Sequence, residues 1–141
     1  LELWEAEFGP RGGDEINIVR AGKDYGWPVI TYGIEYGGEK IGDAIQQKAG
    51  MEQPVYYWDP VISPSGICFY SGTAIPEWKN NLFVASLSGQ HLCRLAIKNN
   101  KVTGEERLLV DKNQRIRDVT YMNEMLFALT DGGDIYRITK N

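Results

Sequence analysis

Residues 81–89 read NLFVASLSG and residues 124–132 read EMLFALTDG, two similar apolar runs that each end in a glycine-containing turn. The segments that follow, LCRL at residues 92–95 and IYRI at residues 135–138, also resemble each other. Aligning Leu82 with Leu126 gives a repeat of 44 residues, and the later pair is 43 residues apart. A period of about 40–45 residues built from short strands and turns is typical of a β-propeller blade. The repeat therefore predicts an all-β chain organised as propeller blades.

Three blades can be written out from the pattern of strands and turns, at residues 1–58, 67–110 and 116–139. The expected strands are residues 1–8, 15–20, 29–32 and 54–60, then 67–71, 81–87, 91–98 and 102–110, and finally 116–122, 125–130 and 134–139. Propellers have four to eight blades, so residues 1–141 are expected to be the carboxy-terminal part of one larger propeller domain. A last blade that is one strand short is expected where an amino-terminal strand closes the ring.

The first blade is expected to contain a half-buried strand and a long loop. In residues 1–8 apolar and acidic residues alternate, which predicts a half-buried strand with Glu2, Glu5 and Glu7 toward water. Residues 33–53 are polar and rich in glycine, so they are expected to form a long loop with at most one or two helical turns near residues 43–48.

Composition excludes several classes of protein. With 141 residues, of which 43% are hydrophobic, the chain has the size of one ordinary domain. A net charge of −4 with scattered Lys and Arg argues against a nucleic-acid partner. No apolar run approaches 18 residues, so no membrane span is expected. Cys68 and Cys93 are too few for a disulfide framework and lack a CxxC spacing, which predicts buried free thiols.

The loop GPRGGDE at residues 9–15 has the composition of a cation site. Pro10 lacks an N–H, and Gly12 and Gly13 can adopt positive φ, so the loop can bend sharply and leave carbonyl groups outside any ladder. Backbone carbonyls with one or two carboxylates, here those of Asp14 and Glu15, are the ligands that calcium takes. The alternative is a tight hairpin with a solvated acidic pair, because the loop lacks the alternating acidic pattern of an EF-hand.

Three motifs in order resemble one known family. They are FGPRGGDEIN at residues 8–17, GKDYGWP at residues 22–28, and QRIRDV at residues 114–119 before LTD at residues 129–131. Together they resemble the soluble quinoprotein aldose and glucose dehydrogenases, the glucose/sorbosone dehydrogenase family, over nearly the whole chain. The resemblance implies a six-bladed propeller that binds pyrroloquinoline quinone (PQQ) and calcium at the channel mouth. It also implies oxidation of the anomeric carbon of a small-molecule sugar by hydride transfer to the quinone.

The resemblance also assigns metal-binding roles to four residues. The family's Gly-Pro pair, whose carbonyls hold the cofactor's calcium, falls on Gly9 and Pro10. The Glu and Tyr associated with an additional calcium in bacterial aldose dehydrogenases fall on Glu15 and Tyr25.

The arginines that contact the quinone's carboxylates in the family correspond to Arg115 and Arg117. In a strand, residues i and i+2 point to one face, so the two guanidiniums can converge on a polycarboxylate. Asp118 is expected to orient one of them through a salt bridge. The alternative is that the two arginines belong to a solvated strand face.

Two departures from the family pattern bear on activity. Where the family commonly has a lysine that contacts the quinone, this sequence has Ser88, so this cofactor contact is changed. The family's general base is a histidine in an earlier blade, and it is not in this chain. His91 lies in a different blade and is interpreted as a rim or packed histidine. No catalytic residue is therefore assigned, and the fragment alone is expected to be inactive.

Two other functions fit the same fold, because fold does not determine function. A non-enzymatic propeller that binds a protein or a glycan is mildly favoured by Ser88. A propeller lactonase would need several convergent acidic or amide side chains, and the sequence shows no such set. The family resemblance implies a periplasmic or secreted location. An open stack of three blades exposes an edge and a face, which a homodimer would cover.

Overall fold

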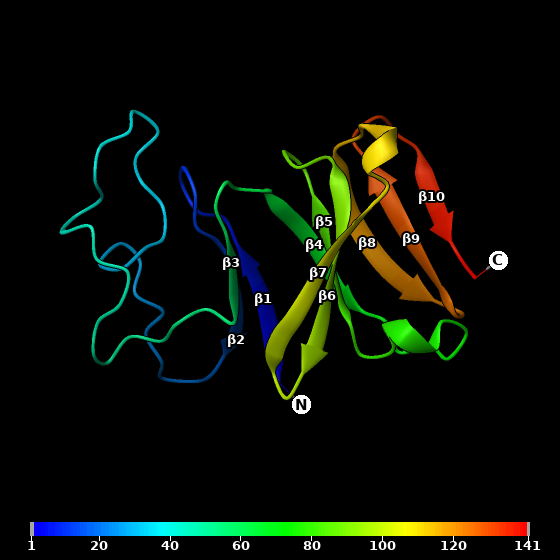
Figure 1. The fold of residues 1–141 in the computed structure, drawn as a ribbon, viewed down its shortest axis with the longest axis horizontal. Helices are drawn as coiled ribbons and strands as arrows, with labels where there is room; N and C mark the ends of the chain where they lie inside the picture. Colours follow the sequence, from blue (N-terminus) through cyan, green and yellow to red (C-terminus); the bar gives the residue numbers. More distant parts are fainter. Residues whose placement is uncertain (1, 141) are drawn as a thin grey trace. The chain divides into compact units, whose positions relative to one another are not determined.

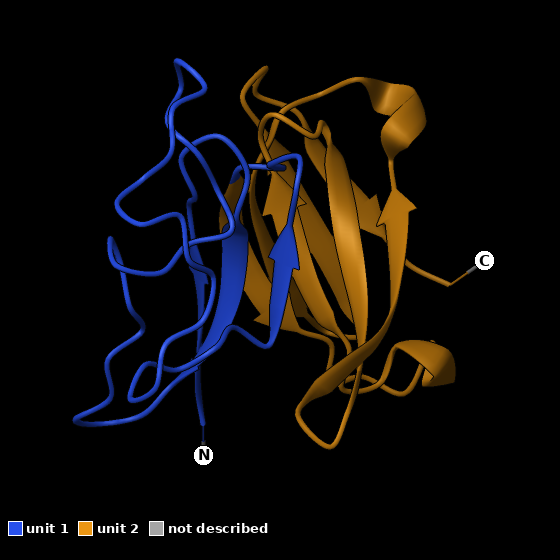
Figure 2. Cartoon of the chain, turned by 60° about the vertical axis from the view of Figure 1, so that its left-hand side comes forward, with its two compact units in different colours: residues 1–63 blue, residues 64–141 orange. Residues whose placement is uncertain are grey.

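The computed structural model describes residues 2–140, and these form an all-β chain with three antiparallel sheets. Its helical segments are two short 3₁₀ helices, η1 (Pro76–Trp78) and η2 (Val110–Lys112). Figure 1 labels the strands along the chain. The chain divides into two compact units, residues 1–63 and residues 64–141 (Figure 2). None of the helices in the described part of the chain is long and apolar enough to cross a membrane.

The first unit contains one three-stranded sheet. Its strands are β1 (Leu3–Glu7), β2 (Asp14–Val19) and β3 (Tyr56–Trp58), in the order β1-β2-β3. Antiparallel pairing places Leu3 opposite Val19 and Glu7 opposite Glu15. The alternating pattern of β2 buries its isoleucines on one face, which is why the predicted strand forms.

One local prediction in this unit is wrong. The expected strand at residues 29–32 is absent, and Ile30 makes only an isolated bridge with Ile45. The Val29 and Ile30 N–H groups both donate to the Gly26 carbonyl, at 2.7 and 3.0 Å, so the chain turns instead of extending. The long loop expected at residues 33–53 is confirmed, and it contains no helical turn at residues 43–48. Ala44 has φ of 56°, which interrupts a right-handed helix.

The second unit contains a four-stranded and a three-stranded sheet, each in sequence order. The first is formed by β4 (Pro64–Phe69), β5 (Leu82–Ser86), β6 (His91–Lys98) and β7 (Lys101–Leu108). The second is formed by β8 (Ile116–Met122), β9 (Met125–Thr130) and β10 (Ile135–Ile138). The observed bounds of β6, β8 and β9 match the predicted ones, and the last sheet has three strands as expected.

The core of the second unit lies between these two sheets. It contains fully or almost fully buried side chains from both of them: Tyr70, Phe83, Ala85 and Leu92 on one side and Ile116, Val119, Leu126 and Ala128 on the other. Four apolar residues of the sequence repeat, Phe83, Ala85, Leu126 and Ala128, are thus among the residues that pack one sheet on the other. Burial of each large side chain contributes about 1.5–3 kcal/mol, so this interface fixes the position of β8.

Both cysteines are free, as expected. Cys93 is buried and Cys68 is half-buried. Burial, with a smaller contribution from the Asp118 charge, raises the pKa of the Cys68 thiol to about 12. Burial likewise raises the pKa of Cys93. Both thiols are therefore neutral packing groups at physiological pH.

Candidate functional site

The loop that precedes β2 is held in place by the buried carboxylate of Asp14, which is 1% exposed. Asp14 Oδ1 accepts a hydrogen bond from the Gly9 N–H at 2.7 Å. Asp14 Oδ2 accepts from the N–H groups of Ile62 and Ser63, at 2.8 and 2.7 Å. Because both oxygens serve the backbone, Asp14 is a structural residue, and the alternative of a solvated acidic pair is wrong for this member.

The same loop requires glycine at position 9. A Cβ added to Gly9 would collide with the carbonyl oxygens of Gly12 and Gly13. Gly12 and Gly13 have φ of 88° and 76°, the positive values that the sequence predicted. Elsewhere in the loop, Arg11 and Ile34 each donate a backbone N–H to the carbonyl of the other, at 3.0 and 2.9 Å. The Gly13 N–H donates to the Trp58 carbonyl at 2.8 Å. These bonds do not involve the carbonyl oxygens of Gly9 and Pro10.

Beside this loop lies a small polar pocket of about 20 Å³, the space of roughly one water molecule or one monatomic ion. Three of the four predicted metal-binding residues, Gly9, Glu15 and Tyr25, line it together with Glu7. The residues present therefore fit a single cation with oxygen ligands. Pro10 is in the loop but is not among the residues that line the pocket.

Glu7 is a pocket residue that the sequence did not reveal, because it was expected to face water. It lies directly opposite Glu15 in the β1–β2 pairing. Burial raises the pKa of both carboxyl groups, and neighbouring negative charges raise them further: Glu5 for Glu7, and Glu7 and Glu5 for Glu15. A hydrogen bond from Asn17 partly offsets the shift at Glu15. Two opposed carboxylates are unfavourable without a cation between them.

The hydroxyl group of Tyr25 already has two partners. It donates to the Ile18 carbonyl at 2.7 Å and accepts from the Arg20 N–H at 2.8 Å. The phenol therefore anchors the segment after β2, and a contact between Tyr25 and a cation would have to use its carbonyl oxygen.

The two predicted cofactor-binding arginines converge on one carboxylate, that of Asp131. Arg115 Nε donates to Asp131 Oδ2 at 2.9 Å. Arg117 Nε and Nη2 donate to Asp131 Oδ1 and Oδ2 at 2.7 and 3.1 Å. Ile116, between the arginines, is fully buried, while all three charged groups remain partly exposed. Hydrogen bonds from Arg117 and then Arg115 hold the pKa of Asp131 below its ordinary value.

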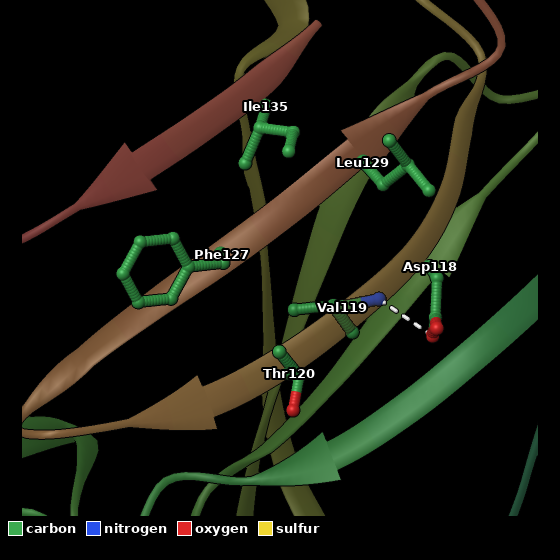
Figure 3. A pocket seen from close by; sticks show the side chains of 6 residues that line it. All are labelled: Asp118, Val119, Thr120, Phe127, Leu129 and Ile135. Atoms are coloured by element: carbon green, nitrogen blue, oxygen red, sulfur yellow. Dashed lines mark hydrogen bonds between the residues drawn. The ribbon is translucent and has the colours of Figure 1, made fainter. Parts of the chain in front are cut away.

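The expected salt bridge from Asp118 to an arginine is wrong. A register shift between Ile116 and Asp118 in the β8–β9 pairing leaves Arg117 and Asp118 both exposed. Asp118 Oδ1 accepts a hydrogen bond from the Val119 N–H at 2.8 Å (Figure 3). Asp131, from the turn after β9, takes the role that was assigned to Asp118.

Asp118 also borders a separate pocket of about 210 Å³ on the sheet β8–β10. Its other lining residues are Val119, Thr120, Phe127, Leu129 and Ile135 (Figure 3). This lining is mainly apolar and includes neither arginine, so the pocket is distinct from the two-arginine site.

Ser88 and His91 flank the turn between β5 and β6. Ser88 is exposed, whereas His91 is 2% exposed, which makes it the packed histidine of the two expected alternatives. His91 Nδ1 lies 2.7 Å from the Gly89 carbonyl, which can only accept, so Nδ1 carries the proton. Burial lowers the pKa of His91, against the effect of this hydrogen bond. Within the described residues His91 Nε2 has no hydrogen-bond partner.

Residues 2–140 contain no group of three or more His, Cys, Asp or Glu side chains that could hold a metal ion. The small pocket described above combines two carboxylates with backbone groups, which is a different kind of site.

The fold is that of a β-propeller, and at the start of β8 its Arg115 and Arg117 hold the carboxylate of Asp131. The chain belongs to the glucose/sorbosone dehydrogenase family, whose model matches residues 1–137. This confirms the family predicted from the three motifs, and with it the propeller fold.

Individual relatives agree with this assignment. The chain is 44% identical over 141 residues to the aldose sugar dehydrogenase YliI of Escherichia coli strain K12. The matched region covers 97% of this chain and 38% of that protein. Its structure is similar to the apo-form of the soluble aldose sugar dehydrogenase from Escherichia coli (TM-score 0.90, 44% identity, 98% of this chain and 40% of that one). The PQQ-bound aldose sugar dehydrogenase from Streptomyces coelicolor is more distant (TM-score 0.71, 26% identity, 97% and 39%). The chain thus spans about two fifths of the length of these relatives.

Proposed function

We propose that this chain is part of a PQQ-dependent aldose dehydrogenase that oxidises the anomeric carbon of a sugar. Membership of the family supports an oxidoreductase of this kind. The relative from Streptomyces coelicolor, which is 26% identical, binds PQQ.

The observation that carries the proposal is the arrangement of Arg115 and Arg117 around a carboxylate. Their three hydrogen bonds to Asp131 show that both guanidiniums reach one carboxylate group at the start of β8. PQQ is a planar tricarboxylate, and arginine forks suit such groups better than a point charge does. In the proposed function these two residues hold the cofactor's carboxylates.

Calcium is the second proposed cofactor. The carbonyls of Gly9 and Pro10 would hold the ion that accompanies PQQ, and the pocket lined by Glu7, Glu15 and Tyr25 would hold an additional ion. When bound, PQQ would accept the hydride, and its calcium would polarise the quinone. The chain's own residues contribute binding and orientation.

The general base for this reaction would be supplied by a part of the protein that is not in this chain. His91 is an unsuitable base because its ring is packed and only 2% exposed. Loss of a general base typically costs about 10²–10⁴ in rate, so the fragment alone would be inactive. We also propose a periplasmic or secreted location, as the family resemblance implies, and a homodimer as the form that covers exposed strand edges.

Titration of the full-length protein with PQQ in the presence of calcium tests the proposal, followed by glucose-dependent reduction of a dye. Saturable binding with sugar-dependent reduction would support it. A folded protein that binds no PQQ would overturn it.

Ser88 favours a second function, a propeller that recognises a protein or a glycan without catalysis. Serine has no charge to offer an anionic cofactor at a position where the family commonly has lysine. Binding of PQQ without any reduction by a range of aldoses would favour this second function over the first.

Replacing Glu7 and Glu15 with glutamine should reduce the stabilisation by calcium to about one third. Both carboxyl groups have raised pKa values, so their stabilising contribution is present below the unfolded pKa and is lost as pH rises through the folded pKa. At pH 7 the metal-free double variant should therefore melt at a higher temperature than the wild type. Calcium at 100 times its Kd should stabilise the wild type by about 2.7 kcal/mol, and a variant with 30-fold weaker affinity by only about 0.9.

Thermal unfolding of the full-length protein in chelator and in excess calcium measures both effects. The matched control is the double substitution Glu35→Gln and Glu39→Gln, which removes the same charge from exposed positions outside the pocket. An equal calcium shift in the pocket variant and in the wild type would show that these carboxylates hold no calcium.

A further inference from the structure

Asp131 occupies a fixed place beside the arginine pair. Its backbone N–H donates to the Arg115 carbonyl at 3.0 Å, so a backbone hydrogen bond joins the turn to the residue that precedes β8. The turn is closed by bonds at Thr130, whose N–H donates to the Asp134 carbonyl and whose hydroxyl accepts from the Asp134 N–H. The carboxylate of Asp131 is therefore presented to both guanidiniums by a rigid turn.

The arginines need such a partner. Two guanidiniums that bind the same carboxylate lie close together and repel each other, and each long side chain has many rotamers. Asp131 takes one N–H of Arg115 and two of Arg117, whereas the two guanidiniums carry ten N–H groups in all. Seven N–H groups are left over after these bonds to Asp131, and the local charge is reduced from two positive charges to one.

We infer that Asp131 is a positioning residue that pre-orients Arg115 and Arg117 for a carboxylate-bearing ligand. Under the proposed function, on which this inference rests, that ligand is PQQ. Asp131 itself does not contact the ligand, and it acts by holding the two guanidiniums at a spacing set by the width of one carboxylate.

Two effects of removing the Asp131 charge oppose each other. Ordering two rotamer-rich side chains on binding weakens affinity by about two- to tenfold for each side chain. Loss of one negative charge near an anionic ligand strengthens affinity only about threefold at an exposed site, because water screens the charge. The ordering effect is larger, so Asp131→Asn should weaken PQQ binding about tenfold.

The test uses the full-length protein with four forms: wild type, Asp131→Asn, Asp131→Glu and the matched control Asp134→Asn. Asp134 lies in the same turn and carries the same charge, but its side chain makes no ion pair with either arginine. PQQ affinity is measured by direct titration in calcium. In arginine-labelled, ligand-free protein, NMR follows exchange of the Nε–H protons of Arg115 and Arg117, since both donate to Asp131.

We expect slow Nε–H exchange and tight PQQ binding in the wild type and in Asp134→Asn. Asp131→Asn should show fast exchange and about tenfold weaker binding, and Asp131→Glu should recover part of both. Unchanged or tighter PQQ binding in Asp131→Asn, or fast exchange in the wild type, would overturn the inference. If the wild type binds no PQQ, the proposed function fails together with the assignment of the ligand, while the exchange data still decide whether Asp131 orders the arginines.

Discussion

Replacing both Arg115 and Arg117 with alanine should weaken PQQ binding by at least about 100-fold. Hydrogen bonds to charged groups contribute about 1.5–3 kcal/mol each, so two lost arginines correspond to about 3–6 kcal/mol, or a factor of about 10²–10⁴. Folding should be little affected, because both side chains are about half exposed and their ion pairs with Asp131 are at the surface. Titration of the full-length protein with PQQ in excess calcium measures the loss.

The control for this prediction removes two positive charges elsewhere. Lys98 and Lys101 face each other in the β6–β7 hairpin, and both are exposed. Changing both to alanine alters the net charge by the same amount but leaves the two-arginine site intact. Equal affinities in the arginine variant and in this control would contradict the cofactor-binding role of Arg115 and Arg117.

Local sequence patterns were sufficient for most of the strands. The strands β6, β8 and β9 were predicted with their observed bounds because each is bounded by a clear turn and contains alternating or continuous apolar residues. Arg115 and Arg117 lie on either side of buried Ile116 and converge on one carboxylate, while their role in binding a cofactor stays a prediction.

Features that depend on pairing between strands could not be predicted in this way. Glu7 belongs to the small pocket because the β1–β2 register places it opposite Glu15. Asp131 replaces Asp118 as the partner of the arginines because a β-bulge shifts the register at Arg117. The apolar residues at positions 29–32 suggested a strand, but two hydrogen bonds to the Gly26 carbonyl turn the chain there. For Glu7 and Asp131 the deciding contact depends on which strands pair and in what register, whereas the turn at residues 26–30 is a local one.

Asp14→Ala should destabilise the protein by about 3–5 kcal/mol. The substitution leaves the N–H groups of Gly9, Ile62 and Ser63 without the carboxylate that accepts from all three. Each buried donor that loses its partner costs about 1–3 kcal/mol, and Asp14 itself is 1% exposed, so water has poor access to replace it.

Urea unfolding of the full-length protein measures the change as a lower midpoint at an unchanged m-value. Asp14→Asn keeps the shape of the side chain but turns one acceptor into a donor. Its free energy of unfolding should therefore lie between that of the wild type and that of Asp14→Ala. Asp43→Ala, at an exposed loop position, is the control and should change the free energy of unfolding by less than about 0.5 kcal/mol. Destabilisation by Asp14→Ala no larger than that of this control would show that the three backbone bonds do not hold the Gly9 loop. The same three bonds place Gly9 beside Glu15 and Tyr25, and Asp14→Ala should therefore also weaken calcium binding without removing any proposed calcium ligand.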